Sequence, residues 1–205
     1  MSKIFIDCGY YKGGAFKLFA RTNEYDADFV FYAFEPGWQF CPEKIIKAEK
    51  QKIVNNKVIL SDKAVWIKDG TIDFYRSGRR GGKANSLYKN LYATKEVVSP
   101  VQCIDFSKWI IDNFSKDDYI VLKLDIEGAE FEVLNKMIND GSIQYIKIAY
   151  IEFHSYKAYS RCPGWEKNNE LYKNLEKKLL DIKGLEIRKK IEWYVAELAL
   201  QKKPS

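Results

Sequence analysis

Residues 122–134 read LKLDIEGAEFEVL, an apolar run that ends in two acids and passes at once into an amphipathic pattern. The run predicts a buried strand that ends at Asp125, and the pattern after it predicts a helix over 129–140. Asp125 and Glu127 stand two residues apart, so an extended backbone would point both side chains in the same direction. Because buried carboxylates are costly without partners, this pair favours a bound ligand at the strand end.

Apolar strands and amphipathic helices alternate along the rest of the chain. The pattern predicts strands at 3–7, 28–35, 56–61, 97–104, 119–125 and 145–153. It predicts helices at 14–25, after Pro36, at 105–114, at 129–140 and at 166–182. The alternation indicates an α/β fold: one domain over residues 1–205, with a mostly parallel sheet covered by helices on both faces.

Three local signals add detail to this arrangement. An Asp-Gly turn at 69–70 predicts a hairpin over 64–76. Pro100 cannot donate a hydrogen bond to a neighbouring strand, which predicts that its own strand lies at a sheet edge. The tail at 185–200 is expected to form two final strands that pair antiparallel.

Composition and charge narrow the class of protein. The net charge is +6, and much of the excess is lysine on predicted helix faces, as on ordinary solvated helices. The four cysteines lie far apart without a Cys-x-x-Cys pair, which argues against a zinc site. No apolar run is long enough to span a membrane, and the first residues lack the pattern of a signal peptide. We therefore expect a cytoplasmic protein.

The carboxyl ends of the predicted strands carry the candidate binding residues, since ligands of open parallel sheets bind at this edge. Glycines at the first strand end let the backbone approach a ligand closely. An acid at the second strand end, Glu35, can accept hydrogen bonds from both ribose hydroxyls of a nucleoside. The nucleoside-binding set is Asp7, Gly9, Tyr11, Gly13, Gly14, Glu35, Pro36, Ser61, Asp62, Ala64 and Asp125.

The last strand before the tail ends in Glu152 and His154, which share one face by the same parity as Asp125 and Glu127. His154 is the only histidine in the chain. Its place beside an acid at the ligand edge makes it a candidate for catalysis, and a purely structural histidine is the alternative.

Several segments together resemble the FkbM family of S-adenosylmethionine-dependent methyltransferases. They are IDCGYYKGG, YAFEP, VILSDKAVWIKDGTIDFY, ANSLY, CIDFSKWI, LKLDIEGAEFEVL and YIEFH, and the resemblance runs over about residues 3–154. It implies a Rossmann-like class I methyltransferase fold with seven strands, the last of them antiparallel. Tyr10 and Tyr11 replace the family's usual small residue and asparagine, so this loop is expected to act through its backbone.

The resemblance also implies methyl transfer to a hydroxyl of a sugar, a glycan or a similar small molecule, with S-adenosylmethionine as cofactor and S-adenosylhomocysteine as product. The acceptor loses a proton, so a general base is expected. His154 is the first candidate, with Glu152 as its orienting partner, and Glu127 is the alternative base. Asp125 is assigned to the cofactor or the acceptor. These side chains also offer ligands for a divalent metal, which is not expected.

Four residues are candidate contacts to the acceptor: Ser86, Tyr88 and Arg80 in a basic loop, and Tyr156 beyond the last strand end. Two other functions stay open. Methylation of RNA or another nucleic acid is suggested by the net charge, but the 125–128 run lacks the Asn/Asp-Pro-Pro-aromatic motif of base methylases. The second is a non-catalytic module that binds a nucleoside or glycan.

Overall fold

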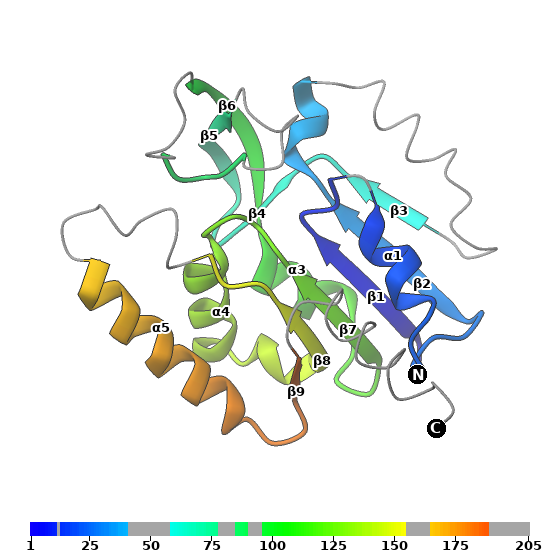
Figure 1. The fold of residues 1–205 in the computed structure, drawn as a ribbon. Coiled ribbons are helices and arrows are strands. Elements are labelled where there is room, and N and C mark those ends of the chain that lie inside the picture. Colours follow the sequence, from blue (N-terminus) through cyan, green and yellow to red (C-terminus); the bar gives the residue numbers. More distant parts are fainter. Residues whose placement is uncertain (12, 41–57, 78–84, 90–95, 155–164, 189–205) are drawn as a thin grey trace, which may run out of the picture.

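The computed structural model describes residues 1–11, 13–40, 58–77, 85–89, 96–154 and 165–188 (Figure 1). Its strands are β1 (Lys3–Cys8), β2 (Phe29–Phe34), β3 (Val58–Ser61), β4 (Ala64–Trp66), β5 (Gly70–Ser77), β6 (Glu96–Asp105), β7 (Tyr119–Leu124), β8 (Ile146–Ile151) and β9 (Glu186–Arg188). Its α-helices are α1 (Gly14–Phe19), α3 (Phe106–Asn113), α4 (Glu130–Asn139) and α5 (Trp165–Leu180). Two short 3₁₀ helices are η1 (Pro36–Phe40) and η3 (Ser142–Tyr145).

The larger sheet has six strands in the order β3-β2-β1-β7-β8-β9, and every neighbouring pair is parallel. The strand order reverses between β1 and β7, so the carboxyl ends of these two strands flank the expected ligand position. The prediction of a mostly parallel sheet is confirmed. β9 lies in the first half of the predicted tail hairpin and runs parallel to β8. The seventh strand and the antiparallel pairing stay predictions, because residues 189–205 lie outside the described residues.

A second sheet has three strands in the order β4-β6-β5. The predicted hairpin over 64–76 is wrong, because β6 lies between the two strands and pairs with both. Ala64 of β4 and Gly70 of β5 are both partners of Cys103, one in a parallel and one in an antiparallel ladder. Residues 67–69 therefore pass across the end of β6, where the Asp69 carboxylate accepts a hydrogen bond from the Asp105 amide.

The prediction that Pro100 marks an edge strand is also wrong. Pro100 itself, however, has a neighbouring strand on one side only. β6 is the middle strand of the small sheet. β4, however, pairs only with residues 103–105, so Pro100 has a partner on the β5 side alone, where it faces Asp73. Gln102, two residues further along β6, donates its amide hydrogen to Gln39 and not to β5. By strand alternation, the nitrogen of Pro100 also faces away from β5, so its missing hydrogen costs no bond of that ladder.

Helices cover both faces of the larger sheet, as the sequence predicts. One face packs on α1 through buried aromatic rings, among them Phe5, Phe16, Phe19 and Phe31. Phe5 lies 4.3 Å from Phe19, measured between ring centroids. The opposite face packs on α3, α4 and α5 through aliphatic side chains of alternate strand positions, including Ile4, Ile6, Leu122 and Leu124. Among the described residues, no helix has the length and apolar character needed to cross a membrane.

Two charged residues, Asp7 and Lys123, lie on the face of the larger sheet that packs on α1. Asp7 and Lys123 belong to the same face as Phe5 and Val121, at the end nearest the carboxyl edge. They are also directly opposite each other in the ladder between β1 and β7. The fold therefore places an acid and a base side by side at the point where the strand order reverses.

The helix α3 starts with an aspartate cap, Asp105. The side chain of Asp105 accepts a hydrogen bond of 3.0 Å from the amide of Lys108. We expect Asp105→Ala to lower the free energy of unfolding by about 1 kcal/mol, the usual loss for removing such a cap. Urea unfolding would measure it, with Asp112→Ala on the same helix as a control that removes only an exposed ion pair. Equal stability of the two variants would contradict the capping role.

Candidate active site

One cavity of about 470 Å³ lies at the carboxyl edge of the larger sheet. Its wall includes loop residues after β1, β2, β7 and β8, and residues of the small sheet stand opposite. The lining residues are Gly9, Tyr10, Tyr11, Gly14, Ala15, Phe34, Glu35, Pro36, Ala64, Val65, Phe74, Asn85, Leu87, Lys123, Asp125, Ile126, Glu127, Glu152 and His154. A cavity of this size suits a ligand of cofactor dimensions.

A buried lysine forms the floor of the cavity. The ammonium group of Lys123 lies 3.0 Å from Oδ1 of Asp7 and 3.2 Å from Oδ2 of Asp125, and it donates a hydrogen bond of 2.7 Å to the Gly9 carbonyl. Burial alone would lower the pKa of Lys123, but the charges of Asp7 and Asp125 raise it. The lysine is therefore a fixed cation beneath the site.

The loop after β1 packs against the end of β7 with no space for a side chain. Gly9 has a φ of 87°, and a Cβ added there would lie 1.9 Å from the carbonyl oxygen of Asp125. Gly13 also has positive φ and caps α1, where an added Cβ would meet the hydroxyl of Tyr10 at 2.3 Å. Only glycine permits both the backbone conformation and the close approach.

Glu35 holds this loop from the second strand end. Its carboxylate accepts hydrogen bonds of 2.9 Å from the Tyr11 amide and 2.8 Å from the Gly37 amide. Burial raises the pKa of Glu35, and the two backbone hydrogen bonds oppose that rise. Tyr11 itself has a φ of 48°, which is unusual outside glycine, so the loop is strained where it meets the acid.

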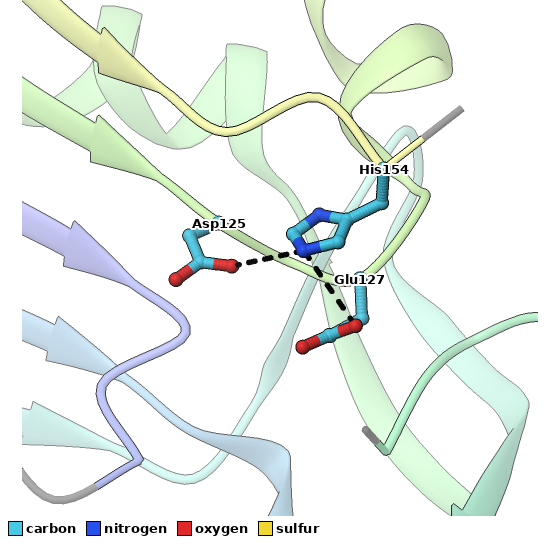
Figure 2. Close-up of side chains that lie close together, drawn as sticks. All are labelled: Asp125, Glu127 and His154. Carbon is cyan, nitrogen blue, oxygen red and sulfur yellow. Dashed lines mark ion pairs between the residues drawn. The ribbon is translucent and has the colours of Figure 1, made fainter. Parts of the chain in front are cut away.

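On the other side of the cavity, Asp125, Glu127 and His154 point toward one another (Figure 2). Nε2 of His154 lies 3.7 Å from a carboxylate oxygen of Asp125, of Glu127 and of Glu152. The predicted convergence of these side chains is therefore seen, but not through extended backbone. β7 ends at Leu124, and Glu127 is in the left-handed region with a φ of 56°.

The side chain in contact with Nδ1 of His154 is that of Glu130, a residue that the sequence did not predict. Nδ1 of His154 lies 3.0 Å from Oε1 of Glu130, whereas the expected partner, Glu152, is 3.7 Å from the other ring nitrogen. Glu130 is fully buried. A signal exists in the sequence: Glu130 occupies the buried face of α4 in helical spacing with Val133, Leu134 and Met137. An acid on an apolar face calls for a buried partner.

The carboxylates set the charge of the cluster. Burial would lower the pKa of His154, but the hydrogen bond and charge of Glu130, with Glu127 and Asp125, raise it to about 9. Burial, with the charges of Asp125, Glu130 and Glu152, raises the pKa of Glu127 to about 7, although His154 opposes this shift. At neutral pH, His154 is therefore an imidazolium and Glu127 is near its midpoint.

Asp125, Glu127 and His154 also have the spacing of ligands that could hold a metal ion, with one atom of each within 4.8 Å of the others. Carboxylate and imidazole groups are common ligands of divalent cations. The imidazolium of His154, however, supplies positive charge to the same carboxylates, so an ion is not needed to balance this part of the cluster.

The structure brings together only part of the predicted nucleoside-binding set. Gly9, Tyr11, Gly14, Glu35, Pro36, Ala64 and Asp125 line the cavity. Asp7 lies beneath it on Lys123, and Gly13 supports Tyr10. Ser61 and Asp62 do not line the cavity, and Asp62 is exposed at the end of β3.

The predicted acceptor contacts fall in different places. Ser86 is buried behind the cavity, where its hydroxyl donates a hydrogen bond of 2.6 Å to the Glu127 carbonyl and accepts one from the Tyr88 amide. Asn85 and Leu87, on either side of Ser86, line the cavity instead. Arg80 and Tyr156 lie outside the described residues.

Comparison with known proteins identifies one family. The family model of the methyltransferase FkbM domain matches residues 7–183, which include every described residue of the cavity wall. No curated protein and no solved structure matches the chain.

The contact between Gly9 and Asp125 generates a stability prediction. We expect Gly9→Ala to destabilise the protein strongly, because its Cβ would overlap the Asp125 carbonyl oxygen and the backbone would have to move. Gly141→Ala is a matched control, since Gly141 has a similar φ of 79° but nothing within 4 Å of an added Cβ. Thermal unfolding of both variants separates the clash from the backbone strain. A loss at Gly9 no larger than that at Gly141 would count against the close approach.

Proposed function

Because the chain belongs to the FkbM methyltransferase family, we propose that it transfers a methyl group from S-adenosylmethionine to a hydroxyl of a sugar, a glycan or a similar small molecule. One observation carries this proposal. A single cavity joins Glu35, the acid at the end of β2, with Glu127 and His154, which follow β7 and β8. The strand order reverses between β1 and β7, within this edge of the sheet.

The residues on the β1–β2 side fit the cofactor. Glu35 would hold the ribose hydroxyls, since each of its carboxylate oxygens accepts one backbone hydrogen bond and has capacity for another. Gly14 leaves open space beside the backbone, since nothing lies within 4 Å of a Cβ added there. Ala64 and Val65 offer an apolar surface for the base. When bound, S-adenosylmethionine would supply an electrophilic methyl group, and Asp125 would face its positive charge.

The charges on the cavity wall favour an acceptor without phosphate or carboxylate groups. Among the described lining residues, Glu35, Asp125, Glu127 and Glu152 are acids, and Lys123 and His154 are the basic groups. Lys123 is already engaged by Asp7 and Asp125. An anionic acceptor would meet net repulsion, whereas the hydroxyls of a neutral sugar can donate hydrogen bonds to these acids. This argues against a nucleic-acid acceptor.

Glu127 is the better general base of the two candidates. A base must be deprotonated at the working pH, and the imidazolium of His154 has no lone pair to accept a proton. Glu127, with a pKa of about 7, is ionised in a large fraction of molecules at neutral pH. Glu127 would accept the proton that the acceptor hydroxyl loses as its oxygen takes the methyl group and the methyl–sulfur bond breaks. His154 stabilises the ionised form of Glu127 beforehand.

Two measurements test the function as a whole. Calorimetric titration with S-adenosylhomocysteine tests the cofactor, and saturable binding is expected. Incubation with methyl-labelled S-adenosylmethionine and a panel of neutral and anionic glycans, with and without EDTA, tests the acceptor and metal dependence. We expect label to appear on a neutral glycan in both conditions. Binding without transfer to any acceptor would favour a non-catalytic module.

Replacing the proposed base separates chemistry from binding. We expect Glu127→Gln to reduce kcat by about 10²–10⁴-fold, the usual contribution of a general base. The affinity for S-adenosylhomocysteine should change little, because Glu127 stands on the acceptor side. Glu170→Gln, an exposed change on α5, is the matched control and should leave kcat unaltered. Near-normal turnover in Glu127→Gln would remove this residue from the mechanism.

The pH dependence of kcat/KM follows from the two shifted groups. Activity should rise as pH increases through about 7, because Glu127 must lose its proton to act as a base. Activity should fall as pH increases through about 9, because His154 then loses the charge that supports Glu127. The result is a bell-shaped profile whose two limbs belong to the coupled cluster. A profile that only rises between pH 6 and 10 would contradict the role of the imidazolium.

A further inference from the structure

We propose that Glu130 is a positioning residue: one buried carboxylate fixes which nitrogen of His154 faces the cavity and also fixes the shape of the loop that carries Glu127. The inference rests on the proposed function for its catalytic meaning, since it explains how the pair Glu127–His154 is held. The geometry on which it stands is independent of any acceptor.

Glu130 is placed to do this by its position in α4. It is the first residue of the helix and is fully buried, on the face that also buries Val133, Leu134 and Met137. A carboxylate enclosed in this way needs hydrogen bonds at both oxygens. Glu130 obtains them from two different segments, the loop after β7 and the residues that follow β8.

The first set of bonds shapes the loop. Oε1 of Glu130 accepts a hydrogen bond of 2.9 Å from the Ile126 amide, and Oε2 accepts one of 2.9 Å from the Gly128 amide. The residue between these amides is Glu127, which has a φ of 56°, and Gly128 has a φ of 114°. Glu130 therefore holds the two ends of a strained turn at whose centre the proposed base stands.

Two hydroxyl groups outside this turn complete its support. The hydroxyl of Ser86 donates to the Glu127 carbonyl at 2.6 Å, and that of Tyr172 donates to the Gly128 carbonyl at 3.3 Å. Both hydroxyls bind carbonyl groups of the turn. Among the described residues, the amides of Ile126 and Gly128 are bound by the Glu130 side chain. The turn is thus held by three side chains from three different parts of the chain.

The last bond of Glu130 orients the histidine. Nδ1 of His154 lies 3.0 Å from Oε1, and a carboxylate that already accepts two amide hydrogens is an acceptor for the Nδ1 hydrogen as well. Nε2 is then the nitrogen that faces Asp125, Glu127 and Glu152. Among the described residues, four acids lie within 3.7 Å of the ring nitrogens, and Lys123 is the basic residue that binds one of these acids, Asp125, together with Asp7.

The wild-type protein offers a direct test, because His154 is the only histidine in the chain. Nitrogen-15 NMR of the imidazole distinguishes the two neutral tautomers. At a pH high enough to neutralise the ring, we expect the remaining hydrogen on Nδ1, held by Glu130. A neutral ring with its hydrogen on Nε2 would overturn the proposal. This measurement needs no substrate, so it is independent of whether the proposed acceptor is correct.

A variant tests the consequence for the reaction. Glu130→Gln keeps the size of the side chain but removes its charge, so the alkaline limb of the pH profile should move to lower pH by about one unit. The NMR titration of His154 should move by the same amount. Glu24→Gln is the matched control, since it removes a partly buried acid from an ion pair with Arg188 that does not line the cavity.

The outcomes are distinguishable. A folded Glu130→Gln protein in which neither the NMR titration nor the pH limb moves would overturn the positioning role. A shift in the NMR titration alone, without methyl transfer in any variant, would retain Glu130 as the residue that positions His154 while the proposed function fails. If Glu130→Gln does not fold, the tautomer in the wild-type protein decides the question.

Discussion

A buried ammonium group holds the carboxyl edge of the larger sheet together. Lys123 binds Asp7 across the β1–β7 ladder, Asp125 at the end of its own strand, and the carbonyl of Gly9 in the loop after β1. Removing one partner of a buried ion pair leaves an uncompensated charge, which costs about 3–5 kcal/mol. The two strand ends at the reversal of strand order are therefore joined by charge as well as by backbone hydrogen bonds. The position of Gly9, and with it the side of the cavity formed after β1, depends on this group.

The same lysine begins a series of alternating charges that continues across the site. Lys123 faces Asp125, Asp125 faces His154, and His154 faces Glu127 and Glu130. The acids favour the charged forms of Lys123 and His154, because attraction between opposite charges is stronger in a partly buried site than in water. Glu35 stands apart from this series and is held by backbone amides instead. The cavity thus has a side organised by main-chain groups and a side organised by paired charges.

The sequence predicted the parts of this structure that depend on local pattern. Strand and helix periodicities placed the elements of the larger sheet, and the strand-end rule placed Glu35, Asp125, Glu127 and His154 at one edge. The hairpin over 64–76 was predicted wrongly because an Asp-Gly turn does not reveal a strand from a distant segment that inserts between its arms.

The sequence also did not predict the partners of the buried charged groups. Lys123 interrupts an apolar strand and Glu130 interrupts an apolar helix face, so each was visible as an exception to its pattern. Their partners were not visible, because these depend on strand register and on the direction in which α4 leaves the sheet. Nδ1 of His154 contacts Glu130 instead of Glu152 because of that direction. The alternation of side chains along a single strand cannot predict such a contact.

The two sheets contribute different kinds of side chain to the cavity wall. The small sheet contributes Ala64, Val65 and Phe74 to the cavity wall, and these side chains carry no charge. Every ionisable lining residue stands at or just beyond a strand end of the larger sheet. Changes of shape in β4 and β5 can therefore alter the uncharged part of the cavity wall while leaving the cluster of charged residues intact. The shape and the charge of the cavity are thus set largely by different sheets.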